Sequence, residues 1–307
     1  MRALDAAIAL SVGLVLAYRR RASLLRLPSR LARLSTWLRG QPLGPPPLPL
    51  TYMISLARRP AKRKTVLERI AAAGLERVVC FDAVDGRELS LEALEARGVA
   101  VYADWKLPES SCRFFSRSLK WGEIGCALSH HAVWELAAGA AEEDVVLVVE
   151  DDVDFLPEFA ALLRETLAEV DELVRTGATP PPDLLYLARR AMKPADDRLV
   201  GERGRASASS SARVRLVQPG FSYKTTAYVL YRRGAKKLVE SGYLRKVIPV
   251  DDFLSVLFTA HEPEPGLARP DLDALFADVP RLQVLAVKPQ LARERRGISD
   301  TENSELM

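Results

Sequence analysis

The feature that most constrains the fold is an apolar run at residues 145–149 that leads directly into acidic residues. Four of its five residues are β-branched, which favours a strand buried on both faces, as in a parallel sheet. Four carboxylates follow, those of Glu150, Asp151, Asp152 and Asp154. In open α/β sheets the ligand crevice lies just outside the carboxyl ends of the strands. We therefore expect an α/β fold with these acids at the crevice.

Crowded carboxylates repel one another at neutral pH and destabilise a fold unless a cation or a proton relieves them. Their oxygens are hard ligands that suit Mg²⁺ or Mn²⁺. The first hypothesis is a metal-assisted site for a phosphate-bearing substrate. The alternative is a solvated acidic turn, which the spacing alone does not exclude.

Charge divides the chain into two parts. Residues 1–50 hold eight arginines and one acid, a net charge of +7, against +4 for the whole chain, so the remainder carries −3. An acidic body does not support a nucleic-acid-binding surface. We expect a leader over residues 1–50, which ends in a stiff proline-rich linker at 41–50, and a single catalytic domain over residues 51–307.

The leader has features of a membrane-associated segment. Residues 6–18 are almost continuously apolar, too short for a membrane span but suited to a signal peptide or signal anchor. Residues 23–38 alternate leucine and arginine as a basic amphipathic helix does, which predicts membrane association through residues 6–38. If residues 6–18 are an anchor, the arginines at 19–21 would place its carboxyl-terminal side in the cytoplasm. A poorly ordered leader is the alternative.

In the remaining chain, apolar runs and amphipathic runs predict an open sheet flanked by helices. A charged and then serine-rich stretch at residues 193–213 predicts a mobile loop. Strands are expected at 51–56, 77–81, 145–149, 183–187, 214–217, 225–230 and 282–287. Helices are expected at 60–73, 90–97, 157–175 and 234–240, with another that ends near residue 138.

Further polar residues stand where predicted strands and helices meet. Arg58 and Arg59 precede a helix that begins at Pro60, and a helix amino-terminus is a natural site for phosphate groups. Two solvated arginines are the alternative. Asp251 and Asp252 begin a later helix, where a carboxylate can also serve as a cap.

Histidine and cysteine give weaker signals. A histidine pair on a helix, His130 and His131, is more often structural than catalytic, and no third zinc ligand stands at a recognisable spacing. Cys80, Cys112 and Cys126 are too few and too scattered for a disulfide framework, although one disulfide is compatible with them.

Eight segments, in order over residues 51–303, resemble glycosyltransferase family 25, and within it the catalytic domain of the procollagen galactosyltransferases. They are Tyr52-Met-Ile-Ser-Leu-Ala-Arg-Arg-Pro-Ala-Lys-Arg63, Asp82-Ala-Val-Asp-Gly86, Gly122-Glu-Ile-Gly-Cys-Ala-Leu-Ser-His130, Val149-Glu-Asp-Asp152, Asp183-Leu-Leu-Tyr-Leu187, Thr226-Ala-Tyr-Val-Leu230 with Gly234-Ala-Lys-Lys-Leu238, Pro249-Val-Asp-Asp-Phe-Leu254 and Ile298-Ser-Asp-Thr-Glu302. The resemblance implies a GT-A-like (Rossmann-like) nucleotide-sugar-binding fold, an inverting mechanism, UDP-galactose as donor, and Mn²⁺ (or Mg²⁺) as cofactor. The implied acceptor is a hydroxyl group, such as hydroxylysine of a collagen-like protein.

The resemblance also implies a role for each site residue. Metal ligands would be Glu150, Asp151 and Asp152, with Asp154 further into the loop. The general base would be Asp251 or Asp252, with Asp251 the better match. The nucleotide-sugar would be bound by Arg58 and Arg59 at the diphosphate, Asp82 and Asp85 at the nucleoside, Asp151, and Glu123, Ser129 and His130, which line or brace the pocket.

Three other functions remain open from the sequence. The first is a family 25 transferase that acts on lipopolysaccharide or another glycan. The second is a catalytically inactive, membrane-associated adhesion or binding module of the same fold. A glycoside hydrolase, which needs neither nucleotide nor metal, is a weaker third. The family analogy places the protein in the lumen of the endoplasmic reticulum or Golgi, with which the arginines at 19–21 conflict.

Overall fold

An eight-stranded mixed sheet forms the centre of the protein, in the strand order β2-β1-β3-β8-β5-β9-β7-β6. β2, β1 and β3 are parallel neighbours, and β5 and β9 are parallel to each other. β8 lies between β3 and β5 and runs antiparallel to both. β10 and β4 form a separate two-stranded ribbon. The strands are β1 (Leu50–Ser55), β2 (Val78–Asp82), β3 (Val145–Glu150), β4 (Val153–Phe155), β5 (Leu184–Ala191), β6 (Arg198–Gly201), β7 (Arg215–Gln218), β8 (Ser222–Tyr231), β9 (Val284–Lys288) and β10 (Ala292–Glu294).

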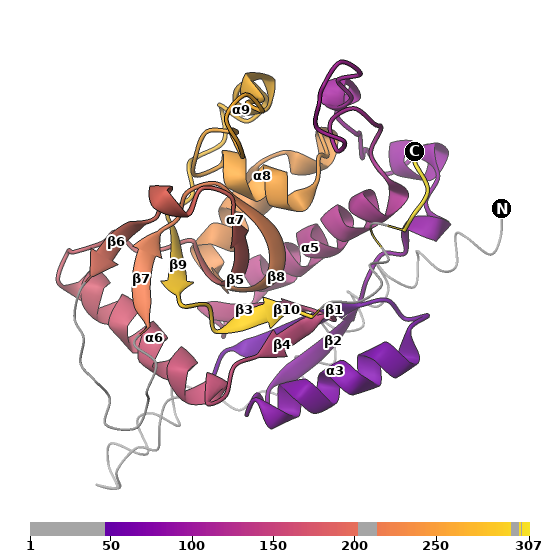
Figure 1. The fold of residues 1–307 in the computed structure, drawn as a ribbon. Coiled ribbons are helices and arrows are strands. Elements are labelled where there is room, and N and C mark those ends of the chain that lie inside the picture. Colours follow the sequence, from indigo (N-terminus) through magenta and orange to yellow (C-terminus); the bar gives the residue numbers. More distant parts are fainter. Residues whose placement is uncertain (1–46, 202–213, 296–300, 302) are drawn as a thin grey trace, which may run out of the picture. The chain divides into compact units, whose positions relative to one another are not determined.

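The computed structural model describes residues 47–201, 214–295, 301 and 303–307 (Figure 1). The predictions for the leader, including the segment at residues 6–38, lie outside this range apart from the last residues of the linker. No helix in the described part of the chain is long and apolar enough to cross a membrane. The longer helices are α3 (Pro60–Ala72), α4 (Leu91–Glu95), α5 (Trp121–Gly139), α6 (Phe159–Arg175), α7 (Arg232–Glu240), α8 (Val250–Val256) and α9 (Pro270–Leu275).

Both faces of the sheet are covered by helices (Figure 1). Alternate residues of β3 belong to different cores: Val146 and Val148 pack with residues of α5, α7 and α8, whereas Leu147 and Val149 pack with residues of α3 and α6. Alternation follows from strand geometry, because successive side chains point to opposite faces. The expected open α/β sheet flanked by helices is confirmed.

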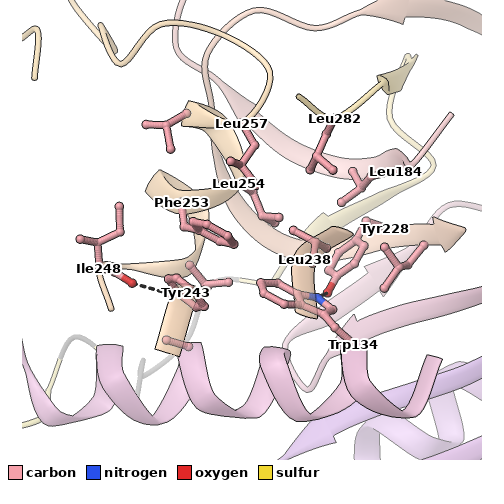
Figure 2. Packing of buried hydrophobic residues seen from close by; sticks show 14 of the residues in the cluster. Trp134, Leu184, Tyr228, Leu238, Tyr243, Ile248, Phe253, Leu254, Leu257 and Leu282 are labelled. Carbon is pink, nitrogen blue, oxygen red and sulfur yellow. Dashed lines mark hydrogen bonds between the residues drawn. The ribbon is translucent and has the colours of Figure 1, made fainter. Parts of the chain in front are cut away.

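Aromatic packing fixes the start of α8 against the sheet and α5 (Figure 2). The rings of Tyr243 and Phe253 stack with centroids 4.0 Å apart, and the Tyr243 hydroxyl donates a hydrogen bond of 2.5 Å to the Ile248 carbonyl. Trp134 of α5 lies 5.9 Å from each ring. These buried aromatic contacts therefore hold the first turn of α8 in place.

One predicted loop is partly wrong. Within residues 193–213, the chain forms a 3-10 turn, η3 (Pro194–Asp196), and then strand β6 at the sheet edge. The cause is a buried ion pair: Arg189 donates to Asp197 at 2.7 Å, and the two side chains are only 5% and 3% exposed. Such a pair anchors the segment, because breaking it would leave an uncompensated buried charge. Residues 202–213 lie outside the described residues.

Candidate functional site

The acidic end of β3 meets α5 and the start of β8 at Glu150. Its Oε1 accepts a hydrogen bond of 2.5 Å from the Thr225 hydroxyl and lies 3.2 Å from Nε2 of His130. His130 is fully buried, and its Nδ1 lies 2.9 Å from the Tyr228 hydroxyl, which also accepts from Trp134. Burial alone would raise the pKa of Glu150, but the hydrogen bonds from His130 and Thr225 hold that pKa below its usual range.

The next two carboxylates have different surroundings. Asp151 is paired, because its Oδ2 accepts from the Ser55 hydroxyl at 2.8 Å and its Oδ1 lies 2.5 Å from the Lys62 ammonium. Asp152 has a buried Oδ1 with no hydrogen-bond partner among the described residues. Burial, and then the negative charge of Glu150, raise the pKa of Asp152 to about 7. Asp152 is thus the carboxylate that most needs a cation.

Asp154 stands apart from these three acids. It lies on β4 opposite Arg293 of β10, and the Arg293 guanidinium donates to its Oδ2 at 2.9 and 3.0 Å. A carboxylate satisfied by an arginine in this way has less need of a cation. The structure therefore separates Asp154 from the Glu150–Asp152 cluster, in line with the weaker match it showed to the family motif.

A second pair of carboxylates occupies the first turn of α8. Asp251 accepts from the Lys224 backbone N–H at 3.2 Å, and Asp252, only 4% exposed, lies 2.7 Å from Nε2 of His261. Burial and then the charge of Asp252 raise the pKa of Asp251 to about 7. A carboxyl group with such a pKa is suited to accept a proton near neutral pH.

Three consecutive residues at the start of β8 connect the two acidic groups. The Tyr223 hydroxyl hydrogen-bonds Asp252, the Lys224 N–H donates to Asp251, and the Thr225 hydroxyl donates to Glu150. Lys224 has a φ of +74°, a left-handed conformation that is strained for a residue other than glycine. Apart from the family resemblance, the sequence held no signal for this link, because the three residues do not stand in a recognisable catalytic spacing.

One of the arginines predicted to bind the donor pairs with a predicted aspartate, and the second predicted aspartate pairs with a different arginine of α3. Arg58 donates to Asp85 in a short ion pair, and Arg63 lies 2.7 Å from Asp82. Arg59 occupies the N-cap position of α3, and Pro60 takes the first helical position. These residues gather at the carboxyl ends of β1 and β2, beside the Lys62–Asp151 pair. Lys62 and Arg63, the next basic residues along α3, were not singled out from the sequence.

Glu123 and Ser129 brace the amino-terminal half of α5. The Glu123 carboxylate accepts from Arg117 at 2.6 Å and from the Lys120 backbone N–H at 2.7 Å, which completes a capping box. Ser129 is fully buried, where its hydroxyl accepts from the Val84 N–H at 2.8 Å. Both contacts tie α5 to its surroundings, and the Ser129 bond fixes the segment after β2 that leads to Asp85.

The thiol of Cys126 approaches the same region. Cys126, His130 and Glu150 bring one ligand atom each within 4.8 Å of one another. Burial raises the pKa of the Cys126 thiol well above its usual range, which opposes the thiolate form that binds metals. The carboxylate cluster would suit a cation better, because it offers hard oxygen ligands and an oxygen without a partner among the described residues.

Comparison with known proteins decides the family. The model of glycosyltransferase family 25 (LPS biosynthesis protein) matches residues 49–254, a range that contains both acidic groups. The chain belongs to glycosyltransferase family 25.

Two curated relatives resemble this family 25 chain over much of its length. A Bos taurus protein named "Probable inactive glycosyltransferase 25 family member 3" is 36% identical over 259 residues, which cover 82% of this chain and 39% of that protein. An Aedes aegypti "Glycosyltransferase 25 family member" is 36% identical over 214 residues, 69% of this chain and 31% of that protein. The chain thus spans about two fifths or less of the length of these relatives.

Among solved structures, a mannose-1-phosphate geranyltransferase from Thermus thermophilus matches with a TM-score of 0.31 and 15% identity, over 81% of this chain and 75% of that chain. Agreement this low supports no conclusion about fold or function.

Proposed function

We propose that this family 25 chain is an active inverting glycosyltransferase that transfers galactose from UDP-galactose to a hydroxyl acceptor, with hydroxylysine of a collagen-like protein as the expected acceptor. One observation carries the proposal: β8 holds two carboxylate groups side by side, one suited to a cation and one suited to a proton. A transferase of this kind needs both, because the departing diphosphate must be stabilised while the acceptor hydroxyl loses its proton.

Donor binding is assigned to the strand ends of β1, β2 and β3. Glu150, Asp151 and Asp152 would hold Mn²⁺ or Mg²⁺, and the buried oxygen of Asp152, without a partner among the described residues, supports that assignment. Such a cation supplies positive charge beside the leaving diphosphate. Arg58 and Arg59 would contact the phosphates, and Asp82 and Asp85 the nucleoside. These contacts require the Arg58–Asp85 pair to separate or shift when the donor binds.

Asp251 is proposed as the general base. It takes the proton of the acceptor hydroxyl as the acceptor oxygen bonds to the anomeric carbon and the bond to the diphosphate oxygen breaks. Its raised pKa, about 7, suits this role near neutral pH, whereas Asp252 is hydrogen-bonded to His261 and Tyr223 and is nearly inaccessible. Of the two neighbouring aspartates, Asp251 is therefore the better candidate for the general base.

A catalytically inactive binding module is the second candidate, because the Bos taurus relative is named probably inactive. A lipopolysaccharide or other glycan acceptor is the third, because the family description names lipopolysaccharide biosynthesis. Membrane attachment through residues 6–38 and a location in the endoplasmic reticulum or Golgi lumen belong to the same proposal and depend on its family analogy.

A donor screen tests the proposal directly. UDP release is measured for a panel of UDP-sugars with and without Mn²⁺, and labelled sugar transfer is then measured to collagen-type peptides and to bacterial glycans. We expect Mn²⁺-dependent turnover with UDP-galactose and transfer to hydroxylysine, both abolished by Asp152→Ala. Absence of turnover with every donor would favour the binding module, and transfer to the glycan alone would reassign the acceptor.

A further inference from the structure

His261 is a fully buried titratable side chain behind the proposed base. It is fully buried after α8, and its Nε2 lies 2.7 Å from Oδ1 of Asp252. Its ring packs against two aromatic rings, 4.9 Å from Phe221 and 5.7 Å from Phe115. Its backbone N–H donates to Asp273 at 2.9 Å, so the loop that carries the ring is also fixed. Neither the motifs nor the proposed mechanism uses this histidine.

The hydrogen bonds assign the proton on the ring. Nδ1 of His261 is buried and has no partner among the described residues. A proton at Nδ1 would therefore leave a buried donor unpaired, at a cost of about 1–3 kcal/mol. A proton at Nε2 is instead donated to Asp252 over 2.7 Å. The neutral ring with its proton at Nε2 is the form that the geometry favours.

We propose that His261 is a positioning residue of the catalytic site: through its Nε2–H it holds Asp252 as a fixed acceptor, and Asp252 in turn orients Tyr223 and flanks Asp251. The proposal rests on the function proposed above. Tyr223 and Lys224 are consecutive, so a fixed Asp252 also secures the backbone N–H that binds Asp251. His261 thus supports the base indirectly: it fixes the position of Asp252, which lies next to Asp251.

Several other groups face Asp251 and must be considered in a pH experiment. Asp252 lies on its own helix, Lys224 and Tyr223 come from β8, Tyr186 comes from β5, and Tyr243 and Cys126 approach from η4 (Tyr243–Arg245) and α5. Among these, the Asp252 carboxylate is the group on which His261 acts directly.

Two variants separate positioning from packing. His261→Gln keeps an N–H donor, and His261→Leu keeps an apolar side chain of similar bulk but no donor. Leu163→Ala, a buried residue of α6 in the other core, is the control for a loss of stability alone. For each variant, kcat/KM is measured against pH, together with UDP–Mn²⁺ affinity. Nitrogen-15 NMR of the wild-type histidine rings reports the proton position independently of activity.

We expect His261→Leu to lower kcat at least about tenfold with UDP–Mn²⁺ affinity unchanged. The acidic limb of its pH profile should move, because an Asp252 side chain without this donor is no longer held in one position beside Asp251. His261→Gln should restore most of the lost kcat and most of the wild-type pH profile. Leu163→Ala should leave the acidic limb of the kcat/KM–pH profile where it is in the wild type. Wild-type NMR should show a neutral ring with the proton at Nε2.

An active wild-type enzyme whose acidic limb does not move in His261→Leu would overturn the inference and leave the proposed function intact. A His261 ring protonated at Nδ1 would overturn it as well. Wild-type protein that is inactive with every donor contradicts the proposed function, and His261 then has no base to position.

Discussion

At the scale of single residues, Lys62 balances the charge of the acidic cluster. Its ammonium lies 2.5 Å from Asp151, and its side chain is 32% exposed, so it can turn toward a ligand. A diphosphate adjacent to Asp151 would offer the same ammonium stronger, doubly charged acceptors. Lys62 is therefore expected to contribute to donor affinity more than to the chemical step.

Lys62→Gln should raise KM for UDP-galactose about tenfold, a loss of ~1.4 kcal/mol in donor binding, with a smaller change in kcat. Initial rates over a range of donor concentrations give both constants. Lys64→Gln, at an exposed position of the same helix, is the matched control and should behave as wild type. Equal effects from the two substitutions would mean that only the general charge of α3 matters.

Asp251 also makes stability depend on pH. Its pKa is about 7 in the folded protein and near 3.8 when unfolded, so the folded state binds more protons between these values. Its contribution to stability is present below about pH 4 and is lost as pH rises through about 7. The pKa of Asp152 is also raised, so its contribution to stability changes with pH in the same direction.

Urea unfolding in a chelator should therefore show lower stability at about pH 8 than at about pH 5, and Asp251→Asn should reduce that difference. Asp152 keeps part of the difference, whereas His131, whose pKa burial lowers to about 4, opposes it. If Asp251→Asn kept the full wild-type pH dependence of stability, the pKa of Asp251 would not be raised in the folded protein.

At the scale of elements, β8 determines whether the two acidic groups lie together. It inserts antiparallel between β3 and β5, which brings its first residues to the carboxyl end of β3. Thr225 then bonds Glu150 and Lys224 bonds Asp251. Both acidic groups therefore depend on the first residues of β8, and a small change there should affect both of them.

Thr225→Val removes the hydroxyl but keeps the branched shape. We expect about a tenfold loss of Mn²⁺-dependent turnover, the net value of a hydrogen bond to a charged group, with little loss of stability. Thr226→Val, whose side chain points to the opposite face of the strand, is the control. Metal titrations of turnover measure the effect, and an unchanged Thr225→Val enzyme would show that Glu150 needs no support from β8.

Local sequence was enough to predict the strand-end acids, the start of α3 at Pro60 and the first turn of α8. Each of these depends on residues within one segment. The parts that were missed depend on pairing between distant segments: Thr225 meets Glu150 only because β8 inserts beside β3, and Arg189 turns a polar loop into strand β6 by pairing with Asp197. Hydrophobic periodicity contains no information about such pairings.

At the scale of the molecule, the chain from Pro47 to Met307 forms one compact unit. Both acidic groups and both hydrophobic cores lie within it. The leader should thus be unnecessary for folding and for the chemistry.

A chain of residues 47–307 should unfold within about 3 °C of the full chain, which corresponds to less than ~1 kcal/mol. It should also keep the kcat of the full chain toward a soluble acceptor. Calorimetry and initial rates on the two proteins provide the comparison. A truncated chain that fails to fold would contradict the expected division between a leader and a catalytic domain.

In the proposed mechanism, one acidic group binds the donor with its cation while the other removes the acceptor proton. Calorimetric UDP–Mn²⁺ binding, measured beside turnover in Asp251→Asn and Asp152→Ala, tests this division most directly. Asp251→Asn is expected to bind UDP–Mn²⁺ as wild type does and to lose at least about a hundredfold in turnover, whereas Asp152→Ala is expected to lose the binding itself. Near-normal turnover in Asp251→Asn, or intact Mn²⁺-dependent binding in Asp152→Ala, would contradict it.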